Sequence, residues 1–244
     1  MLTPGNKKLG GHLIWGFGLP SGAAAVCVGM TPTCRTHCYA IRTEGYRRTA
    51  ARRYRRNLFL SRRRDFARRV RAFIFAQAIR VVRIHTGGDF YSVRYAHKWL
   101  TVIRRCRRTR FFFYTRAWRV PAIRTVIDQM AVLPNCRVWY SCDVDTGLPD
   151  SVPAPVRIAW LMTAPSELPL AGTHLVFRVR HLRRHPMAGT GACVCPAEDG
   201  IPRPRGATCD RCGYCWRPLP LGRIQLPVIN ATPELPPTSE PERR

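Results

Sequence analysis

Hydrophobic and polar positions follow two different patterns along this chain. Between residues 45 and 79 there is no proline, and apolar side chains recur at roughly helical spacing among arginines. These apolar positions are Phe59, Phe66, Val70, Phe73 and Ile74. The spacing predicts helix, in two pieces that break near Asn57 to Ser61. From residue 81 onward the apolar positions instead form short runs bounded by turn-forming residues.

The short runs are rich in β-branched and aromatic residues and mostly lack strict alternation, which is typical of strands buried on both faces of a parallel sheet. They are Val81–His85, Phe111–Thr115, Arg137–Ser141, Arg157–Met162 and His174–Val179. Helical patterns over Val93–Cys106 and Val120–Leu133 separate the first three runs at βαβ spacing. The later runs lie closer together. The sequence therefore predicts an α/β fold, an incomplete (β/α) barrel with mostly parallel strands.

The chain divides by composition into three parts. We expect the partial barrel, with its arginine-rich helices, to occupy residues 1–190, and a small cysteine-rich metal module to occupy 191–217. A proline-rich tail follows at 218–244, and residues 231–244 have too little apolar content to become ordered. No apolar run approaches the roughly 18 residues that span a bilayer, and the start lacks a signal-peptide pattern. A cytoplasmic location without membrane contact is expected, whereas the oligomeric state is left open.

The net charge of the chain indicates which class of molecule it binds. Forty-one basic residues against fourteen acidic ones give a net charge of +27, which attracts polyanions and favours nucleic acid, either DNA or RNA. A GC-rich genome is an alternative source of this bias, because only three of the basic residues are lysines. The arginines expected to contact phosphates, or else to form a solvated helix face, are Arg47, Arg48, Arg52, Arg53, Arg55 and Arg56.

Functional groups collect at the carboxyl ends of parallel strands, and the first three predicted strands end in unusual residues. The first is followed by Gly87, Gly88 and Asp89, the second ends in Thr115 and Arg116, and the third is followed by Asp143 and Asp145. We expect Thr115 and Arg116 to contact a bound cofactor, and Asp89 to have a functional role. The candidate catalytic residues are His85, Asp143 and Asp145. For His85 a hydrogen-bonded core position is an equal alternative, and for Asp89 a turn and helix cap.

Three cysteines cluster near the start of the chain, at Cys27, Cys34 and Cys38. Their segment contains glycine and proline, so it predicts a loop able to surround a metal or cluster. Three thiolates leave one coordination position open, which is typical of catalytic sites. His37 is the alternative fourth ligand of a zinc site. The basic neighbours Arg35 and His37 predict lowered pKa values for these thiols.

A second group of cysteines lies near the other end. The chain contains eleven cysteines, an odd number that argues against a disulfide framework. Four of them have the spacing of a closed zinc site or an auxiliary iron–sulfur cluster, with Cys193 as a spare ligand. The four are Cys195, Cys209, Cys212 and Cys215.

The cysteine loop ending in Cys38-Tyr39-Ala40, followed after the next strand by Gly87-Gly88-Asp89, resembles the radical S-adenosylmethionine enzymes. The resemblance implies a [4Fe–4S] cluster on Cys27, Cys34 and Cys38, whose open iron binds S-adenosylmethionine. It places Tyr39 at the aromatic position beside the last cysteine, and Gly87, Gly88 and Asp89 at the cofactor-binding strand end. The cysteines here have six and three intervening residues instead of three and two, and Asp replaces Glu.

A second resemblance covers most of residues 5–217. The chain is similar to the gene-product-eighty-eight-like family of phage and plasmid proteins. The segments that carry this resemblance are Asn6–Gly10, Trp15–Gly22, Thr33–Ala40, His85–Ser92, Tyr114–Arg116, Ser141–Gly147 and the terminal cysteine pattern. That family implies a mobile-element origin.

Two hypotheses for function follow. The first is an iron–sulfur, radical S-adenosylmethionine-like enzyme that acts on nucleic acid or a nucleotide-like substrate. The second is a non-catalytic, zinc-stabilised protein that binds DNA or RNA. The strand-end Gly-Gly-Asp favours the first, and the altered cysteine spacing favours the second.

Overall fold

A computed structural model describes residues 1–167, 169–183, 193–199 and 208–217. The described strands form one eight-stranded sheet in the order β1 to β8, and only β1 runs antiparallel to its neighbour. The strands are β1 (Thr3–Pro4), β2 (Ile14–Phe17), β3 (Val81–Ile84), β4 (Arg110–Thr115), β5 (Cys136–Cys142), β6 (Arg157–Met162), β7 (Leu175–Arg178) and β8 (Cys193–Val194). The fold is therefore mixed α/β with a mostly parallel sheet, and within the described residues the sheet stays open at β1 and β8.

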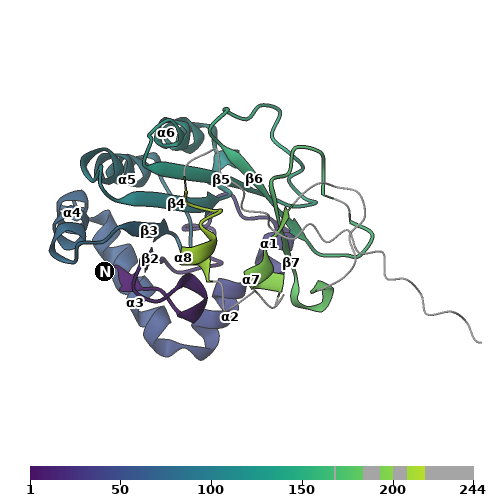
Figure 1. The fold of residues 1–244 in the computed structure, drawn as a ribbon, viewed down its shortest axis with the longest axis horizontal. Helices are drawn as coiled ribbons and strands as arrows, with labels where there is room; N and C mark the ends of the chain where they lie inside the picture. The colour runs from purple at the N-terminus through teal and green to yellow at the C-terminus, as the bar shows by residue number, and fades with distance from the viewer. Residues whose placement is uncertain (168, 184–192, 200–207, 218–244) are drawn as a thin grey trace, which may run out of the picture.

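Three crossover helices cover the same face of the sheet. Each parallel strand lies beside its predecessor, and crossovers of one hand place these helices on one side. Figure 1 shows α4 (Phe66–Ala76), α5 (Val93–Arg105) and α6 (Pro121–Ala131) in this layer. The longest helix of the β2–β3 connection, at Arg48–Arg62, lies outside this layer. Shorter elements, α7 (Pro196–Asp199) and α8 (Cys209–Cys212), cross the opposite face. In the part of the chain that the structure describes, the face opposite α4, α5 and α6 is therefore covered only by short elements, which leaves space on it for a binding site.

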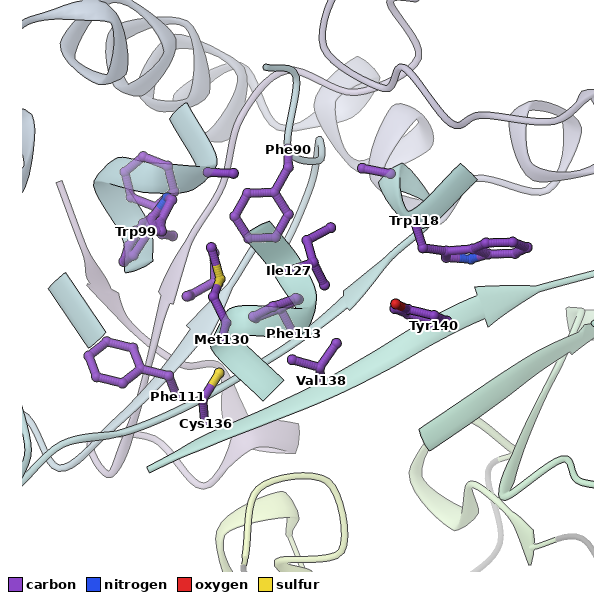
Figure 2. Packing of buried hydrophobic residues seen from close by; sticks show 14 of the residues in the cluster. Phe90, Trp99, Phe111, Phe113, Trp118, Ile127, Met130, Cys136, Val138 and Tyr140 are labelled. Atoms are coloured by element: carbon purple, nitrogen blue, oxygen red, sulfur yellow. The ribbon is translucent and has the colours of Figure 1, made fainter. Parts of the chain in front are cut away.

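The main core fills the space between the sheet and the long helices. Trp99 and Met130 from α5 and α6 pack with Phe111 and Phe113 of β4, and all four side chains are fully buried (Figure 2). The intervening residue Phe112 belongs to a separate cluster on the other face. Both faces of β4 are therefore buried, which explains its continuous apolar run.

The expected strands and crossover helices are confirmed to within one or two residues at each end. The long helical stretch differs from the prediction, because α3 (Arg48–Arg62) continues through Asn57 and Ser61 and ends before Asp65. Asn57 is buried and donates from Nδ2 to the Gly18 carbonyl oxygen at 3.0 Å. These polar side chains satisfy tertiary contacts without breaking the helix.

Strand β2 was not predicted, because its four residues contain a glycine and lack a recognisable pattern. A Cβ atom at Gly16 would lie 2.7 Å from the Thr86 side chain, so the close approach of these segments requires glycine. The predicted tail at 218–244, its disordered part at 231–244, and much of the 191–217 module lie outside the described residues. None of the helices in the described ranges is long and apolar enough to cross a membrane.

Candidate functional site

A cavity of about 300 Å³ lies at the carboxyl edge of the sheet, on the face opposite the long helices. Strand-end residues of β3, β4, β5 and β7 form its walls together with the N-terminal cysteine segment. The residues expected from the sequence that line it are Cys27, Cys34, Cys38, Tyr39, His85, Gly87, Gly88, Asp89 and Arg116. Segments as far apart as residues 27 and 116 therefore border one space.

The cysteine segment follows β2 and contains a five-residue helix, α1 (Pro32–Thr36), where the sequence predicted only a loop. The Thr31 hydroxyl oxygen caps this helix by accepting from the Cys34 backbone N–H at 2.9 Å. Cys38 precedes α2 (Tyr39–Tyr46). A Cβ atom at Gly29 would lie 2.0 Å from the Arg116 carbonyl oxygen, so glycine allows the segment to pack on the end of β4.

Two predicted catalytic residues hold this segment in place. Asp143 is fully buried, and its Oδ2 accepts from the Thr31 hydroxyl at 2.7 Å and from Arg116 Nη2 at 2.6 Å. Asp145 Oδ2 accepts from the Thr33 backbone N–H at 2.8 Å. Neither aspartate lines the cavity. Their contacts indicate a positioning role, and direct participation in chemistry stays a prediction.

Asp89 ties the end of β3 to the end of β4. Its carboxylate accepts from the Thr115 hydroxyl at 2.6 Å, and from the backbone N–H groups of Arg116 and Ala117 at 2.8 and 3.1 Å. The Phe90 N–H adds a fourth bond at 2.7 Å. Burial raises the pKa of Asp89, although these hydrogen bonds act in the opposite direction. The carboxylate is thus occupied by the protein itself, and Thr115 is buried behind it.

His85 lines the cavity as a neutral imidazole. Burial lowers its pKa to about 3. Its Nε2 lies 3.0 Å from the Tyr95 hydroxyl, which also accepts from Trp99 Nε1 at 2.8 Å. Either His85 Nε2 or the Tyr95 hydroxyl can be the donor of this bond, because the Tyr95 oxygen can accept twice. The other ring nitrogen, Nδ1, is buried 3.9 Å from Asp89 Oδ1 without a hydrogen-bond partner among the described residues. His85 therefore combines the buried hydrogen-bonded position with a place in the cavity wall, and a role as proton donor stays untested.

The cysteines of the N-terminal segment are free and half-buried. Burial raises the pKa of Cys27 to about 12, with nearby Asp89 and the other two thiols adding to the effect. Burial also raises the pKa of Cys34, against the opposing charge of Arg116. The expectation that Arg35 and His37 would lower these values is therefore wrong for Cys27 and Cys34, because desolvation outweighs the charges of neighbouring residues.

The three thiols share one cavity without converging on one point. Across residues 1–167, 169–183, 193–199 and 208–217, no three Cys, His, Asp or Glu side chains are arranged to hold a single metal ion. His37 also borders the cavity. The arrangement gives no preformed Cys₃His zinc site in the part of the chain that the structure describes.

The four C-terminal cysteines line a different, much smaller cavity of about 40 Å³. The Tyr114 hydroxyl donates to Cys215 Sγ at 2.8 Å, and Trp139 Nε1 donates to the Cys215 carbonyl oxygen at 3.0 Å. Trp216 Nε1 donates to the Cys209 carbonyl oxygen at 3.1 Å. Aromatic side chains of the sheet thus fasten this segment onto the face opposite the long helices.

One chain of side chains connects the two cysteine sites. The Tyr39 hydroxyl donates to the Thr86 carbonyl oxygen at 2.8 Å and accepts from Arg83 Nη2 at 3.0 Å. The Arg83 guanidinium lies 5.7 Å from the centre of the Tyr114 ring, and Tyr114 in turn contacts Cys215. Arg83 and Tyr114 line both cavities. The Tyr39 ring itself stays 52% exposed.

Comparison with known proteins gives the family. A family model described as Gene product 88 matches residues 1–218. The chain belongs to this family. Gene 88 proteins of Mycobacterium phage D29 and Mycobacterium phage L5 are each 30% identical to it over 140 residues, 53% of this chain and 57% of theirs. The chain therefore matches little more than half the length of these relatives, and no solved structure matches it. The Gene product 88 resemblance is confirmed, whereas the radical S-adenosylmethionine resemblance stays a prediction.

On this Gene product 88 chain, the predicted nucleic-acid arginines occupy the exposed side of α3 and its start. Arg53 is half-buried, and the other five arginines are exposed. Two aromatic side chains, Tyr46 and Phe59, stand in the same region with 70% and 64% of their surface exposed. Aromatic rings among arginines suit contact with single-stranded nucleic acid, although this contact is untested.

Sequence reasoning missed the arginines at the rim of the larger cavity in this family member. Arg42 projects from α2, and Arg178, Arg180 and Arg183 follow one another at and after the end of β7. The strand-end rule that singled out Asp89 applies equally to the run His174–Val179. Applied there, it would have pointed to Arg180.

Proposed function

We propose that this protein binds an iron–sulfur cluster through Cys27, Cys34 and Cys38 and acts as a radical S-adenosylmethionine-like enzyme. The observation that carries the proposal is the meeting of the cysteine segment and the Gly-Gly-Asp strand end at one cavity. The cysteine segment follows the first parallel strand, β2, and Gly87-Gly88-Asp89 follows the second, β3. Their order along the chain and their common cavity agree with the resemblance in the motifs.

The donor set suits a cluster. A single zinc ion needs its ligands around one point, whereas a [4Fe–4S] cluster takes each cysteine on a different iron and fills the volume between them. The three cysteines line one cavity of about 300 Å³. We propose that a cluster is bound there, with one iron left without a cysteine.

The remaining residues have distinct roles in this proposal. A bound cluster, once reduced by an external one-electron donor, would supply the electron for reductive cleavage of S-adenosylmethionine and so initiate radical chemistry on the substrate. Tyr39, fixed by two hydrogen bonds, offers its exposed ring to the cofactor's adenine. The backbone of Gly87 and Gly88 borders the cofactor. Asp89 and Thr115 act behind the wall by holding the backbone of Arg116.

The finer architecture belongs to the same proposal. A parallel sheet in strictly sequential order, with its helices on one face, is the arrangement of part of a (β/α) barrel. The C-terminal cysteines are then the ligands of a second metal site, either zinc or a second cluster, on the face of the sheet opposite the long helices. In the described residues their side chains, like those of the N-terminal group, form no preformed site for a single ion. Closure by four protein ligands makes that site structural.

The test is metal analysis of the full chain after anaerobic purification and reconstitution with iron and sulfide. We expect iron and sulfide at the N-terminal site, with broad visible absorption that bleaches on reduction. Cys34→Ala should remove this iron and spare the C-terminal metal, whereas Cys106→Ala, outside both groups, should leave both unchanged. A zinc-replete protein that takes up no iron would contradict the proposal.

The exposed arginines of α3 support a second function, binding of DNA or RNA by a zinc-stabilised protein without catalysis. The observation in its favour is the exposure of Tyr46 and Phe59 beside five exposed arginines. Zinc at both cysteine sites together with salt-sensitive nucleic-acid binding would support this alternative.

A further inference from the structure

The larger cavity has a strong excess of positive charge. Six arginines line it, against two carboxylates, Asp89 and Glu198. The arginines are Arg42, Arg83, Arg116, Arg178, Arg180 and Arg183. A concave surface with charges of one sign concentrates the opposite charge, so this cavity selects anions.

The two carboxylates do not offset this excess. Asp89 accepts four hydrogen bonds from its own chain, so its carboxylate is already satisfied by protein donors. Glu198 forms an ion pair with Lys8, which is not among the residues that line the larger cavity. Because Lys8 neutralises Glu198, this carboxylate does not offset the positive charge of the arginines that line the cavity.

The arginines fall into an inner and a rim group. The inner three arginines already interact with the protein. Arg83 donates a hydrogen bond to Tyr39, Arg116 forms an ion pair with Asp143, and Arg178 also has an interaction partner. Arg42, Arg180 and Arg183 are exposed at the rim, and no carboxylate of the described residues forms an ion pair with Arg42 or Arg180. Arg183 lies near enough to Glu198 to help lower the pKa of that carboxyl. Arg42 and Arg180 are therefore the clearest free cations.

We infer that the substrate of this cavity carries a phosphate group, which Arg42 and Arg180 bind at the rim. Guanidinium groups bind phosphate through paired N–H donors in a fixed plane, and a phosphate offers enough oxygens and charge for both arginines. The phosphate belongs either to a mononucleotide or to the backbone of a strand. The inference rests on the proposed function for the reaction, but the binding of phosphate is measured without it.

The test uses the full chain, before and after reconstitution, and measures binding by calorimetry. The probes are thymidine 5′-monophosphate, thymidine, and single-stranded oligothymidylate. The variant is Arg42→Gln with Arg180→Gln, and the matched control is Arg104→Gln with Arg105→Gln, two exposed arginines at the end of α5. Since both rim side chains are exposed, their replacement removes no buried contact. Circular dichroism checks the fold, and Arg180→Gln alone serves as a second variant.

We expect the monophosphate to bind more tightly than thymidine, and the rim variant to lose about tenfold or more of that affinity, while the control keeps it. If only oligothymidylate binds and the rim variant weakens it, the phosphate comes from a strand. Equal affinity for monophosphate and thymidine, or equal affinity of the rim variant and the wild type for both phosphate probes, would overturn the inference.

Failure of this inference is separable from failure of the proposed function. The rim variant should still take up iron and still respond to S-adenosylmethionine. The Arg42 backbone N–H donates to the Cys38 carbonyl oxygen at 3.5 Å, and a side-chain substitution keeps this bond. A wild type that binds iron and S-adenosylmethionine but no phosphate probe would overturn only the substrate class. A wild type that binds the monophosphate through the rim but takes up no iron would overturn only the proposed reaction.

Discussion

The two cysteine sites of this protein use the same side chain in opposite surroundings. The N-terminal site borders a cavity of about 300 Å³, whereas the C-terminal site encloses about 40 Å³ beneath Tyr114 and Trp216. Polar contacts from Asp143 and Asp145 hold the first, and aromatic side chains close the second. The difference teaches that two cysteine groups with ligand-like spacing can have very different space around them. Under the proposed function, only the N-terminal group has room for a further ligand beside a cluster.

The largest expected effect comes from the closed site. Cys209→Ser or Cys212→Ser should destabilise the fold by several kcal/mol and lower Tm by about 10 °C or more, because the module's metal-binding energy contributes to folding. Cys34→Ala at the open site should change Tm far less. Thermal unfolding of the metal-loaded variants measures this contrast. Full stability and full metal content in a C-terminal variant would show that the ligand assignment is wrong.

Asp143→Asn tests what holds the open site. The substitution removes the buried charge that binds Arg116 and Thr31, and breaking such a pair costs about 3 kcal/mol or more. We expect reduced iron at the N-terminal site with unchanged metal at the C-terminal site. Asp145→Asn, which weakens only the hydrogen bond from the Thr33 N–H, is the matched control and should lose less iron. Equal iron content in both variants and the wild type would show that Asp143 does not hold the N-terminal cysteine segment in place for metal binding.

His85, in the wall of the larger cavity, makes the stability of the fold depend on pH. Burial lowers its pKa to about 3, so between that value and about 6.5 the unfolded chain binds a proton that the folded chain does not. Stability present at neutral pH is therefore lost as pH falls through this window, by up to about 1.4 kcal/mol per unit.

The measurement is denaturant unfolding at several pH values for the wild type and His85→Asn. Asparagine does not titrate and tolerates the positive φ of 62° at this position. The variant should show a shallower loss of stability on acidification. Asp89, whose raised pKa acts in the opposite direction, is present in both proteins. Parallel curves for the two proteins would contradict a neutral, buried His85.

The smallest expected effect concerns the arginines of α3, which belong to neither cysteine site. Replacing Arg52, Arg53, Arg55 and Arg56 by Gln should lower the salt dependence of single-strand binding by up to about 3 in the logarithmic slope, since each lost phosphate contact contributes about 0.7. The control replaces Arg104, Arg105, Arg107 and Arg108, which removes the same charge from exposed positions elsewhere. An identical slope in both variants would show that α3 is not the contact surface.

The sequence predicts the strands well because their apolar runs are buried on both faces, as with Phe111 and Phe112 of β4. It also predicts which strand ends meet at one cavity, since parallel strands place their carboxyl ends along one edge. It does not predict that Asp89 faces its own chain, because the donors of Thr115 and Arg116 become neighbours only through the register of β3 and β4. The sequence also does not predict the raised pKa of Cys27, because that shift comes from burial, which depends on the packing of the fold.

The central claim is that the open site binds a cluster with one iron free for a cofactor, and electron paramagnetic resonance tests it most directly. The spectrum of the reduced, reconstituted protein is recorded with and without S-adenosylmethionine, and the Cys209→Ser protein serves as a control that retains the N-terminal site. We predict that S-adenosylmethionine shifts the signal of the wild type and of this control, and that Cys34→Ala abolishes the shift. An iron-loaded wild type whose signal is unchanged by S-adenosylmethionine would contradict the account.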